Sequence, residues 1–177
     1  TPVGKQLMKD AADNVLRTSM ELGGNAPFIV FEDADLDKAV QGAIDAKMRN
    51  MGEACTSANR ILVHRSVIDE FGRRLTEKMA ALTVGNGVDD GVDVGPLVEE
   101  KAVAKVKGLV DDAVSRGAKV LTGGTRGDGP GFFYPPTVLS GVSPESELMS
   151  TEIFGPVAAL IPFDTDEEAV TMANDTE

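Results

Sequence analysis

The hydrophobic and polar positions of this chain form two kinds of pattern that alternate along the sequence. Short apolar or β-branched runs, which are typical of strands, predict strands at residues 27–31, 61–63, 119–122, 134–139 and 157–163. Apolar residues three and four positions apart share one face of a helix, and they predict helices at residues 4–17, 36–44, 67–82, 103–114 and 165–174. This alternation predicts an α/β fold with a mostly parallel sheet and helices on both faces.

Residues at the boundaries of these segments predict where the helices begin and end. Asp33, Asp35 or Asp37 can cap the start of the helix at 36–44. The glycines of segment 84–87 are available for a left-handed cap on the helix before them, and Gly117 closes the helix at 103–114. The uninterrupted run at 27–31 is expected to be a strand that is buried on both faces.

Composition limits the classes of protein to which the chain can belong. Of its 177 residues 42% are apolar, which is enough for a proper core, and its net charge of −12 disfavours nucleic acid and anionic membranes as partners. No apolar run approaches the roughly 20 residues that span a bilayer. A single cysteine excludes an internal disulfide and is compatible with a reducing compartment. We therefore expect a cytoplasmic protein with neither a nucleic-acid nor a membrane partner.

Cys55 and Glu21 are the candidate catalytic residues. Cys55 is the only cysteine, and each residue precedes a predicted strand, so both lie in loops where chemistry can be exposed. Ligands of such sheets usually gather at the carboxyl ends of the strands. One thiol and one carboxylate suffice for covalent acyl chemistry, because a thiolate attacks a carbonyl and a carboxylate activates water. The alternatives are a small buried cysteine and a solvated surface glutamate.

Four motifs together resemble the aldehyde dehydrogenase superfamily. Residues 20–27 (Met-Glu-Leu-Gly-Gly-Asn-Ala-Pro) resemble its glutamate signature, and residues 52–55 (Gly-Glu-Ala-Cys) its cysteine signature, which usually reads Gly-Gln-x-Cys. Residues 151–157 resemble its Glu-x-Phe-Gly-Pro motif, and residues 1–5 the end of the Gly-Ser-Thr-x-x-Gly segment of its cofactor domain. The order and spacing of the motifs match the family over nearly the whole chain.

The resemblance implies a role for each candidate residue. Cys55 would be the nucleophile that forms a hemithioacetal and then a thioester, and its backbone amide would donate to the developing oxyanion. Glu21 would activate the water that hydrolyses the thioester. The implied enzyme is an NAD(P)-dependent aldehyde dehydrogenase, and no motif indicates a metal site.

The same resemblance implies that NAD or NADP is the cofactor. Glu152 would hold the hydroxyls of the nicotinamide ribose and Phe154 would pack beside the nicotinamide. Gly23 would let the cofactor approach the backbone closely, and Leu22 and Gly4 belong to the same implied cofactor-binding set. The residues alone leave two alternatives open, a surface acid for Glu152 and core packing for Phe154.

Residues 47–50 (Lys-Met-Arg-Asn) stand where succinate-semialdehyde dehydrogenases carry Lys-Phe-Arg-Asn, and residues 21–31 look most like that subfamily. Its arginine binds the distal carboxylate of the substrate, so the resemblance implies this role for Arg49, six residues before Cys55. The alternative is an exposed helix-end arginine. The implied reaction oxidises succinate semialdehyde to succinate.

Two residues near Cys55 depart from the family pattern. Glu53 replaces the usual glutamine, and a carboxylate that pointed at the thiol would disfavour the thiolate, so we expect it to point away. Ser57 stands where some relatives carry a second cysteine, so a disulfide through that position is excluded.

Other functions remain open at this stage. The chain is also compatible with an aldehyde dehydrogenase for glutarate semialdehyde or a hydroxyaldehyde, with a non-catalytic structural relative, and with a thiol redox sensor, which a lone cysteine disfavours. Because the chain begins without methionine and stops just past a helical pattern, we expect a piece of a longer enzyme. Residues 1–20 would end a dinucleotide-binding domain, and residues 21–177 would be a catalytic domain truncated at its C-terminus. The piece is expected to be inactive alone, and its parent to form a homodimer or homotetramer.

Overall fold

The computed structural model of this chain describes residues 1–127 and 129–176. Its helices are α1 (Pro2–Ala12), α2 (Leu36–Met48), α3 (Ile68–Ala80), α4 (Glu100–Ser115) and α5 (Asp166–Asn174), with short 3-10 turns η1 (Arg49–Gly52) and η2 (Glu147–Met149). Its strands are β1 (Pro27–Val30), β2 (Arg60–His64), β3 (Lys119–Thr122), β4 (Thr137–Ser140) and β5 (Val157–Phe163). Every segment that the hydrophobic pattern predicts contains an element of the predicted type.

The strands form one five-stranded sheet in the order β1-β2-β5-β4-β3. The pairs β1–β2, β2–β5 and β4–β5 are parallel, and only β3 runs antiparallel to its neighbour β4. The predicted α/β fold with a mostly parallel sheet is therefore confirmed. Because no helix intervenes between β3 and β4, the chain can turn back directly, which an antiparallel pair allows and a parallel pair does not.

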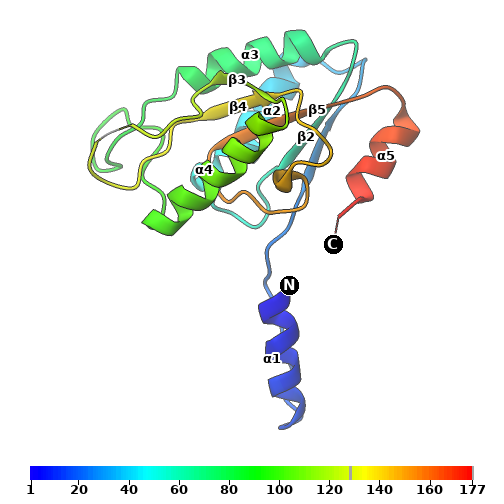
Figure 1. Cartoon of the computed structure of the whole chain (residues 1–177), viewed down its shortest axis with the longest axis vertical. Coiled ribbons are helices and arrows are strands. Elements are labelled where there is room, and N and C mark those ends of the chain that lie inside the picture. The colour runs from blue at the N-terminus through cyan, green and yellow to red at the C-terminus, as the bar shows by residue number, and fades with distance from the viewer. Residues whose placement is uncertain (128, 177) are drawn as a thin grey trace.

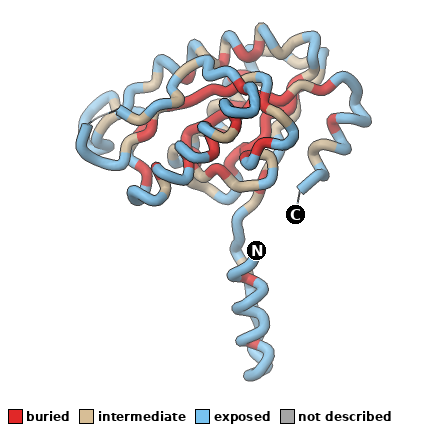
Figure 2. Tube along the Cα trace, in the orientation of Figure 1, coloured by how far each residue is buried: buried red, intermediate tan, exposed pale blue. Residues whose placement is uncertain are grey.

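Helices cover both faces of the sheet, and each face has its own core (Figures 1 and 2). On one face α2 and α3 pack against Ile61, Val63 and Leu160. On the other face α4 and α5 pack against Leu62 and Ile161. Adjacent residues of β2 and β5 thus belong to opposite cores, because side chains alternate across a strand. Both central strands are buried on both faces, which explains their uninterrupted apolar sequence.

Three boundary predictions are wrong in their details. β1 lies at an edge of the sheet, so Phe28 and Ile29 are only half-buried and the strand is not buried on both faces. The fourth strand begins at Thr137, after two prolines that cannot donate to a strand ladder. α3 ends at Ala80 with Ala81 still in a right-handed conformation, and neither glycine of segment 84–87 has a positive φ.

Two predicted helix ends are confirmed by their geometry. The carboxylate of Asp35 accepts a hydrogen bond of 3.2 Å from the backbone N–H of Lys38, so Asp35 is the residue that caps α2. Gly117 follows α4 with a φ of 100°, a conformation that residues with a Cβ rarely adopt. The backbone N–H of Gly117 donates to the carbonyl of Val114 at the end of the helix.

α1 stands apart from the rest of the molecule in Figure 1. It ends at Ala12 rather than continuing to residue 17, and Val15 takes a left-handed φ of 51° in the turn that follows. Its apolar residues Val3, Leu7 and Met8 are exposed, because within the described residues α1 touches the rest of the chain mainly at its first turn. No helix in residues 1–127 or 129–176 is both long and apolar enough to cross a membrane.

Gly108 and Gly117 provide a matched test of how α4 is terminated. A Cβ on either glycine would meet no atom within 4 Å, so the two sites differ in backbone conformation rather than in space. Gly108→Ala is expected to stabilise the protein by about 0.5–1 kcal/mol, because alanine favours a helix interior. Gly117→Ala is expected to destabilise it by about 1–2 kcal/mol, because alanine is strained at positive φ. Urea unfolding measures both changes, and equal effects would contradict the assignment of Gly117 as the helix terminator.

Candidate functional site

Three loops that precede neighbouring strands form the candidate site. Residues 19–26 lead into β1, residues 53–59 into β2 and residues 150–156 into β5, and these strands lie side by side in the same direction. The loops therefore meet at the amino-terminal edge of the sheet. The general expectation that ligands gather at the carboxyl edge does not hold for these residues, because here the polar segments come before the strands rather than after them.

The three loops enclose an open cleft of about 780 Å³. Cys55 and Glu21 both line it, from different loops, and Arg49 lines it from η1. The sequence-predicted residues that also line it are Glu152, Phe154, Leu22 and Gly23. The fold thus gathers seven of the eight predicted site residues in one place, and the eighth, Gly4, lies against Leu22.

Cys55 is exposed in the turn that precedes β2. Its backbone N–H makes no hydrogen bond within residues 1–127 and 129–176, whereas the neighbouring N–H of Ser57 donates to Ala54. Gly24 of the first loop lies close to the carbonyl of Cys55. A Cβ added to Gly24 would lie 3.3 Å from that carbonyl oxygen. The thiol and one backbone donor are therefore both free to meet a molecule in the cleft.

The backbone just before Cys55 is strained. Asn50 and Met51 have φ values of 48° and 58°, and Gly52 follows at 80°. Asparagine tolerates this left-handed region, but methionine rarely enters it, so the surroundings must hold the turn in place. The Asn50 amide donates to the Glu53 carbonyl at 2.9 Å, and a Cβ on Gly52 would collide with the carbonyl of Gly155. The contact with Gly155 joins the Cys55 loop to the Glu152 loop.

Glu152 lies against two glycines in a way that suits a hydroxyl-bearing ligand. One carboxylate oxygen accepts a hydrogen bond of 3.3 Å from the N–H of Gly24, and a Cβ on Gly23 would collide with the other oxygen. A neighbouring cavity of about 420 Å³ runs from Glu152 and Gly23 to Thr1 and Pro2 at the start of α1. The two carboxylate oxygens of Glu152 are acceptors, and the glycines beside them carry no side chain. This arrangement fits the ribose of a dinucleotide, because its hydroxyls are donors and its ring must lie close to the backbone.

A buried pair of amides ties the three loops together. Asn59, which is 2% exposed, donates to the side-chain oxygen of Asn25 and to the carbonyl of Thr151 at 3.1 Å. Its own side-chain oxygen accepts the N–H of Ile153 at 2.8 Å, and the Asn25 amide donates to Met149 at 2.5 Å. The Asn59 amide therefore spans from its own loop to the loop that carries Glu152, and the Asn25 amide spans to η2, directly before that loop. All of these polar groups are satisfied, which makes the connection rigid rather than costly.

Arg60 extends this connection to the C-terminal helix. Its guanidinium is buried and donates to the carbonyls of Asn25 at 3.0 Å, Met172 at 2.5 Å and Ala173 at 2.9 Å. The last two carbonyls belong to the final turn of α5, where no following helical turn supplies N–H donors to them. Arg60 thus fixes α5 to the Glu21 loop.

Lys47 is a buried lysine in the last turn of α2 that the sequence pattern did not indicate. Its side chain is 1% exposed, and its Nζ has no hydrogen-bond partner in the described part of the chain. Burial lowers the pKa of Lys47 to about 7, and the negative charge of Glu152 opposes this shift. Its Cε lies 3.2 Å from the position of a Cβ on Gly52, so it ends behind the strained turn before Cys55.

The departures from the family pattern have clear structural roles. One carboxylate oxygen of Glu53 accepts the N–H of Val98 at 3.2 Å, so this side chain anchors segment 94–98. The expectation that the Glu53 carboxylate points away from the thiol agrees with that contact. Ser57 is buried, and its hydroxyl donates to the carbonyl of Lys47 at 3.3 Å. Arg49 is exposed and forms no ion pair with any described residue.

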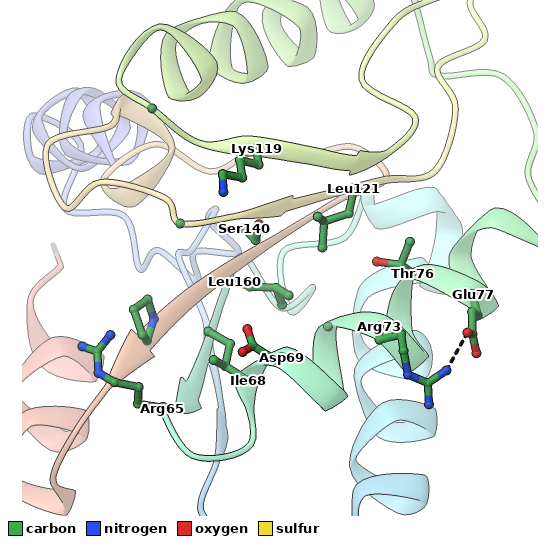
Figure 3. Close-up of a pocket in the computed structure, with 14 residues that line it drawn as sticks. Arg65, Ile68, Asp69, Arg73, Thr76, Glu77, Lys119, Leu121, Ser140 and Leu160 are labelled. Atoms are coloured by element: carbon green, nitrogen blue, oxygen red, sulfur yellow. Dashed lines mark hydrogen bonds and ion pairs between the residues drawn. The ribbon is translucent and has the colours of Figure 1, made fainter.

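A second groove, of about 690 Å³, lies between α3 and strands β3, β4 and β5 (Figure 3). It contains none of the predicted site residues, and Arg73 at its rim is already paired with Glu77 at 2.6 Å. His64 lies at the carboxyl end of β2, where its ring nitrogens bond Ser66 and the Asp164 carbonyl. Among the described residues no group of three or more His, Cys, Asp or Glu side chains could hold a metal ion. The cleft around Cys55 is therefore the candidate site, because it combines a thiol with carboxylates.

Sequence reasoning missed the residues that support this site. Asn25 and Asn59 lie next to predicted strands, and Lys47 is the first residue of the segment 47–50, yet nothing in the sequence distinguishes the three from ordinary polar residues. A polar residue directly before an apolar run, as with Asn59 and Arg60, is a weak signal for a buried support. The burial of Lys47 has no local signal, because it depends on the loops that cover it.

Comparison with known proteins gives a consistent result along the whole chain. The sequence matches the profile described as Aldehyde dehydrogenase family over residues 1–177. It is 57% identical to a succinate-semialdehyde dehydrogenase of Paenarthrobacter nicotinovorans and 50% identical to a glutarate-semialdehyde dehydrogenase of Pseudomonas putida, over all of this chain and 39% and 36% of theirs. A crystal structure described as an E. coli NADP dependent enzyme superposes with a TM-score of 0.97 at 46% identity, over 99% of this chain and 37% of that one. The chain thus spans well under half the length of these relatives.

The amide pair can be tested by removing one partner. Asn59→Leu keeps the approximate volume but leaves the Asn25 oxygen, the Thr151 carbonyl and the Ile153 N–H unpaired. We expect a loss of at least about 3 kcal/mol of unfolding free energy, since three groups are left unsatisfied and each costs about 1–3 kcal/mol when buried. Urea unfolding measures the loss, and hydrogen exchange at Ile153 should accelerate. The exposed Asn86→Ala variant is the control, and a similar small effect in both variants would contradict the network.

Lys47 predicts a pH-dependent effect on stability. Because its pKa falls from 10.5 to about 7 on folding, the unfolded chain binds more protons between these values, and stability attributable to this site rises with pH across that window. Below pH 7 Lys47 is charged in both the folded and the unfolded chain, so the full cost of burying its ammonium group lowers the free energy of unfolding. Lys47→Met should therefore stabilise the protein by a few kcal/mol at pH 6.5, at about 1.4 kcal/mol per pKa unit, and by clearly less at pH 9.5. Urea unfolding at both pH values measures this, with the exposed Lys38→Met as control, and a pH-independent gain would contradict the assignment.

Proposed function

This chain belongs to the aldehyde dehydrogenase family, and we propose that it carries the catalytic residues of a longer NAD(P)-dependent enzyme that oxidises succinate semialdehyde to succinate. The observation that supports this most directly is the convergence of Cys55, Glu21 and Arg49 on one cleft from separate segments. These three groups supply a nucleophile, a base and a carboxylate anchor. The non-catalytic alternative offers no reason for an exposed thiol and a carboxylate to share a cleft.

Cys55 performs the first half of the proposed reaction. Its thiolate adds to the aldehyde carbon, and the carbonyl oxygen becomes an oxyanion next to the N–H of Cys55, which has no partner in the described part of the chain. One such donor contributes about 3 kcal/mol to transition-state stabilisation in acyl-transfer enzymes. The strained turn at residues 50–52 presents both the thiol and this N–H to the cleft.

Glu21 performs the second half. After oxidation the substrate is attached to Cys55 as a thioester, and a water molecule must attack its carbonyl carbon. The Glu21 carboxylate accepts a proton from that water, the carbon–sulfur bond breaks, and the acid leaves as the thiol is restored. Glu21 is exposed on the opposite loop of the same cleft, so water reaches it freely.

NAD or NADP would lie beside Glu152, where it would supply the two-electron acceptor of the oxidation. Glu152 would accept hydrogen bonds from the ribose hydroxyls, and Phe154 would pack on the nicotinamide side. Gly23 and Gly24 would allow close approach of the ring, and Leu22 would be held in place by its contact with Gly4. A relative that is described as NADP dependent supports the cofactor class.

Arg49 would bind the distal carboxylate of the substrate. Its guanidinium is exposed in the cleft and unpaired among the described residues, so it is available for a bidentate contact. The sequence of residues 47–50 and the 57% identity to a succinate-semialdehyde dehydrogenase support succinate semialdehyde. Glutarate semialdehyde, one methylene longer, is the second candidate because a relative at 50% identity is described as acting on it.

We propose the same domain division as the motifs imply, with residues 1–20 ending a cofactor-binding domain and residues 21–177 belonging to the catalytic domain. The exposed apolar side of α1 and the unpaired edge of β1 support it, since both surfaces suit further protein. A homodimer or homotetramer in the cytoplasm remains our proposal for the parent.

Arg49 gives the test of this proposed function. In a protein of full family length that contains these residues, Arg49→Gln should raise KM for succinate semialdehyde roughly 10- to 100-fold, since hydrogen bonds to a charged group contribute about 1.5–3 kcal/mol. The KM for butanal, which has the same number of carbons and no carboxylate, should stay within about twofold. NAD(P)H absorbance measures both.

Two control variants complete this experiment. Arg65→Gln changes an exposed arginine at the opposite edge of the sheet that is paired with Asp164, and should leave both KM values unchanged. Cys55→Ser should abolish turnover of both aldehydes, because the hydroxyl is a far weaker nucleophile. Preference for butanal in the unaltered enzyme, with no effect of Arg49→Gln, would overturn the substrate assignment and leave the family chemistry intact.

A further inference from the structure

Lys47 is a buried basic group behind the catalytic cleft that the proposed reaction does not use. Its Nζ is unpaired within the described residues, and its side chain ends against Gly52, whose backbone touches Gly155. Those two glycines belong to the segments that carry Cys55 and Glu152. The ammonium group therefore stands directly behind the junction of the two loops that form one wall of the cleft.

The ionisable side chains that line the cleft are mostly acidic. Glu21, Glu53 and Glu152 oppose a single basic residue, Arg49. An anionic semialdehyde that enters this cleft is repelled by the carboxylates of Glu21 and Glu152, whereas that of Glu53 is turned toward Val98. Arg49 is exposed and hence screened by solvent. A buried charge is screened much less, so a cation behind the wall contributes more to the potential inside the cleft than its separation from the substrate suggests.

We infer that Lys47 is a specificity-determining residue, whose buried ammonium makes the cleft favourable for an anionic aldehyde while it carries its proton. This inference rests on the proposed function, since it assumes a carboxylate-bearing substrate. It adds a second cation to Arg49, placed behind the protein backbone rather than in contact with the ligand. Uncharged aldehydes gain nothing from it.

The charged groups around Lys47 define the pH range of this effect. Glu152 is the charged group that acts on Lys47 from the opposite loop, and the other charged groups that line the cleft are Glu21, Glu53 and Arg49. On α3, which packs along α2, Arg74 and Lys78 are engaged with Asp37 and Gln41 nearer the start of α2. Because the pKa of Lys47 is lowered to about 7 by burial, its charge is present at pH 6 and largely lost at pH 8.5.

The test measures how strongly succinate protects Cys55 from alkylation by iodoacetamide, a neutral reagent, in the full-length protein without cofactor. Rates with and without succinate are compared at the same pH, so that the ionisation of Cys55 itself cancels. The concentration of succinate that gives half protection should rise roughly tenfold between pH 6 and pH 8.5. This is the size expected when one partly screened charge interaction, that of Lys47 with succinate, is lost. Lys47→Met should require the higher concentration at both pH values.

The controls separate a charge effect from a folding effect. Lys38→Met makes the same substitution at an exposed position of α2 and should behave like the unaltered protein. Lys47→Gln removes the charge but keeps a polar group, and should match Lys47→Met. A steady-state readout follows from the same logic: the ratio of KM for succinate semialdehyde to KM for butanal should rise with pH in the unaltered enzyme and be flat in both Lys47 variants.

The outcomes distinguish this inference from the proposed function. If succinate protects Cys55 equally at both pH values, and the Lys47 variants show the same protection, Lys47 has no role in specificity and the inference is overturned while the proposed function stands. If succinate never protects and succinate semialdehyde is not oxidised, both fail together. A pH-dependent protection that persists in Lys47→Met would also overturn the inference, because another group would then carry the charge.

Discussion

The hydrogen bonds between the buried amides of Asn25 and Asn59 are the constraint on which the rest of the site depends. Strand ladders fix β1, β2 and β5, but in the segments before those strands backbone bonding of this kind reaches only their last residues, as in the bond from the N–H of Asn59 to the carbonyl of Ala26. Asn59 replaces the ladder with bonds to Asn25, Thr151 and Ile153, so three segments far apart in sequence acquire fixed relative positions. Because the Asn59 amide and its bonds to Asn25 and Ile153 are buried, breaking one of these two bonds leaves an unsatisfied group that costs more than the bond itself contributes. The cleft is therefore held as one unit.

Rigid support makes the local strain before Cys55 tolerable. Met51 would not take a left-handed backbone by itself, yet it lies between Asn50, which closes the turn through Glu53, and Gly52, which touches the backbone of Gly155. Any side chain at position 52 would push the Cys55 loop away from the Glu152 loop. Gly23 has a similar role opposite the Glu152 carboxylate. At both positions close contact requires a residue without a Cβ, and the contact brings a functional side chain to the cleft.

Charge is distributed unevenly between the surface and the interior. The chain carries a net charge of −12, and most of the lysines and arginines that form ion pairs do so at the surface, where each pair contributes little. Arg60 and Lys47 differ from these residues, because both are buried. Arg60 is fully engaged with carbonyl groups, so it acts as a structural anchor for α5. Lys47 has no such partners among the described residues, and its Nζ stays buried behind the turn that precedes Cys55.

The amino-acid sequence by itself determined the helices, the strands, the α/β class and the motifs around Cys55, Glu21 and Glu152, because periodicity and short motifs are local properties. It did not determine that β1 is an edge strand, that β3 runs antiparallel, or that the cleft lies at the amino-terminal edge of the sheet. Those features depend on strand order. The roles of Asn59 and Lys47 were likewise decided only by the tertiary structure, since a polar residue becomes a support or a buried charge according to which distant segments cover it.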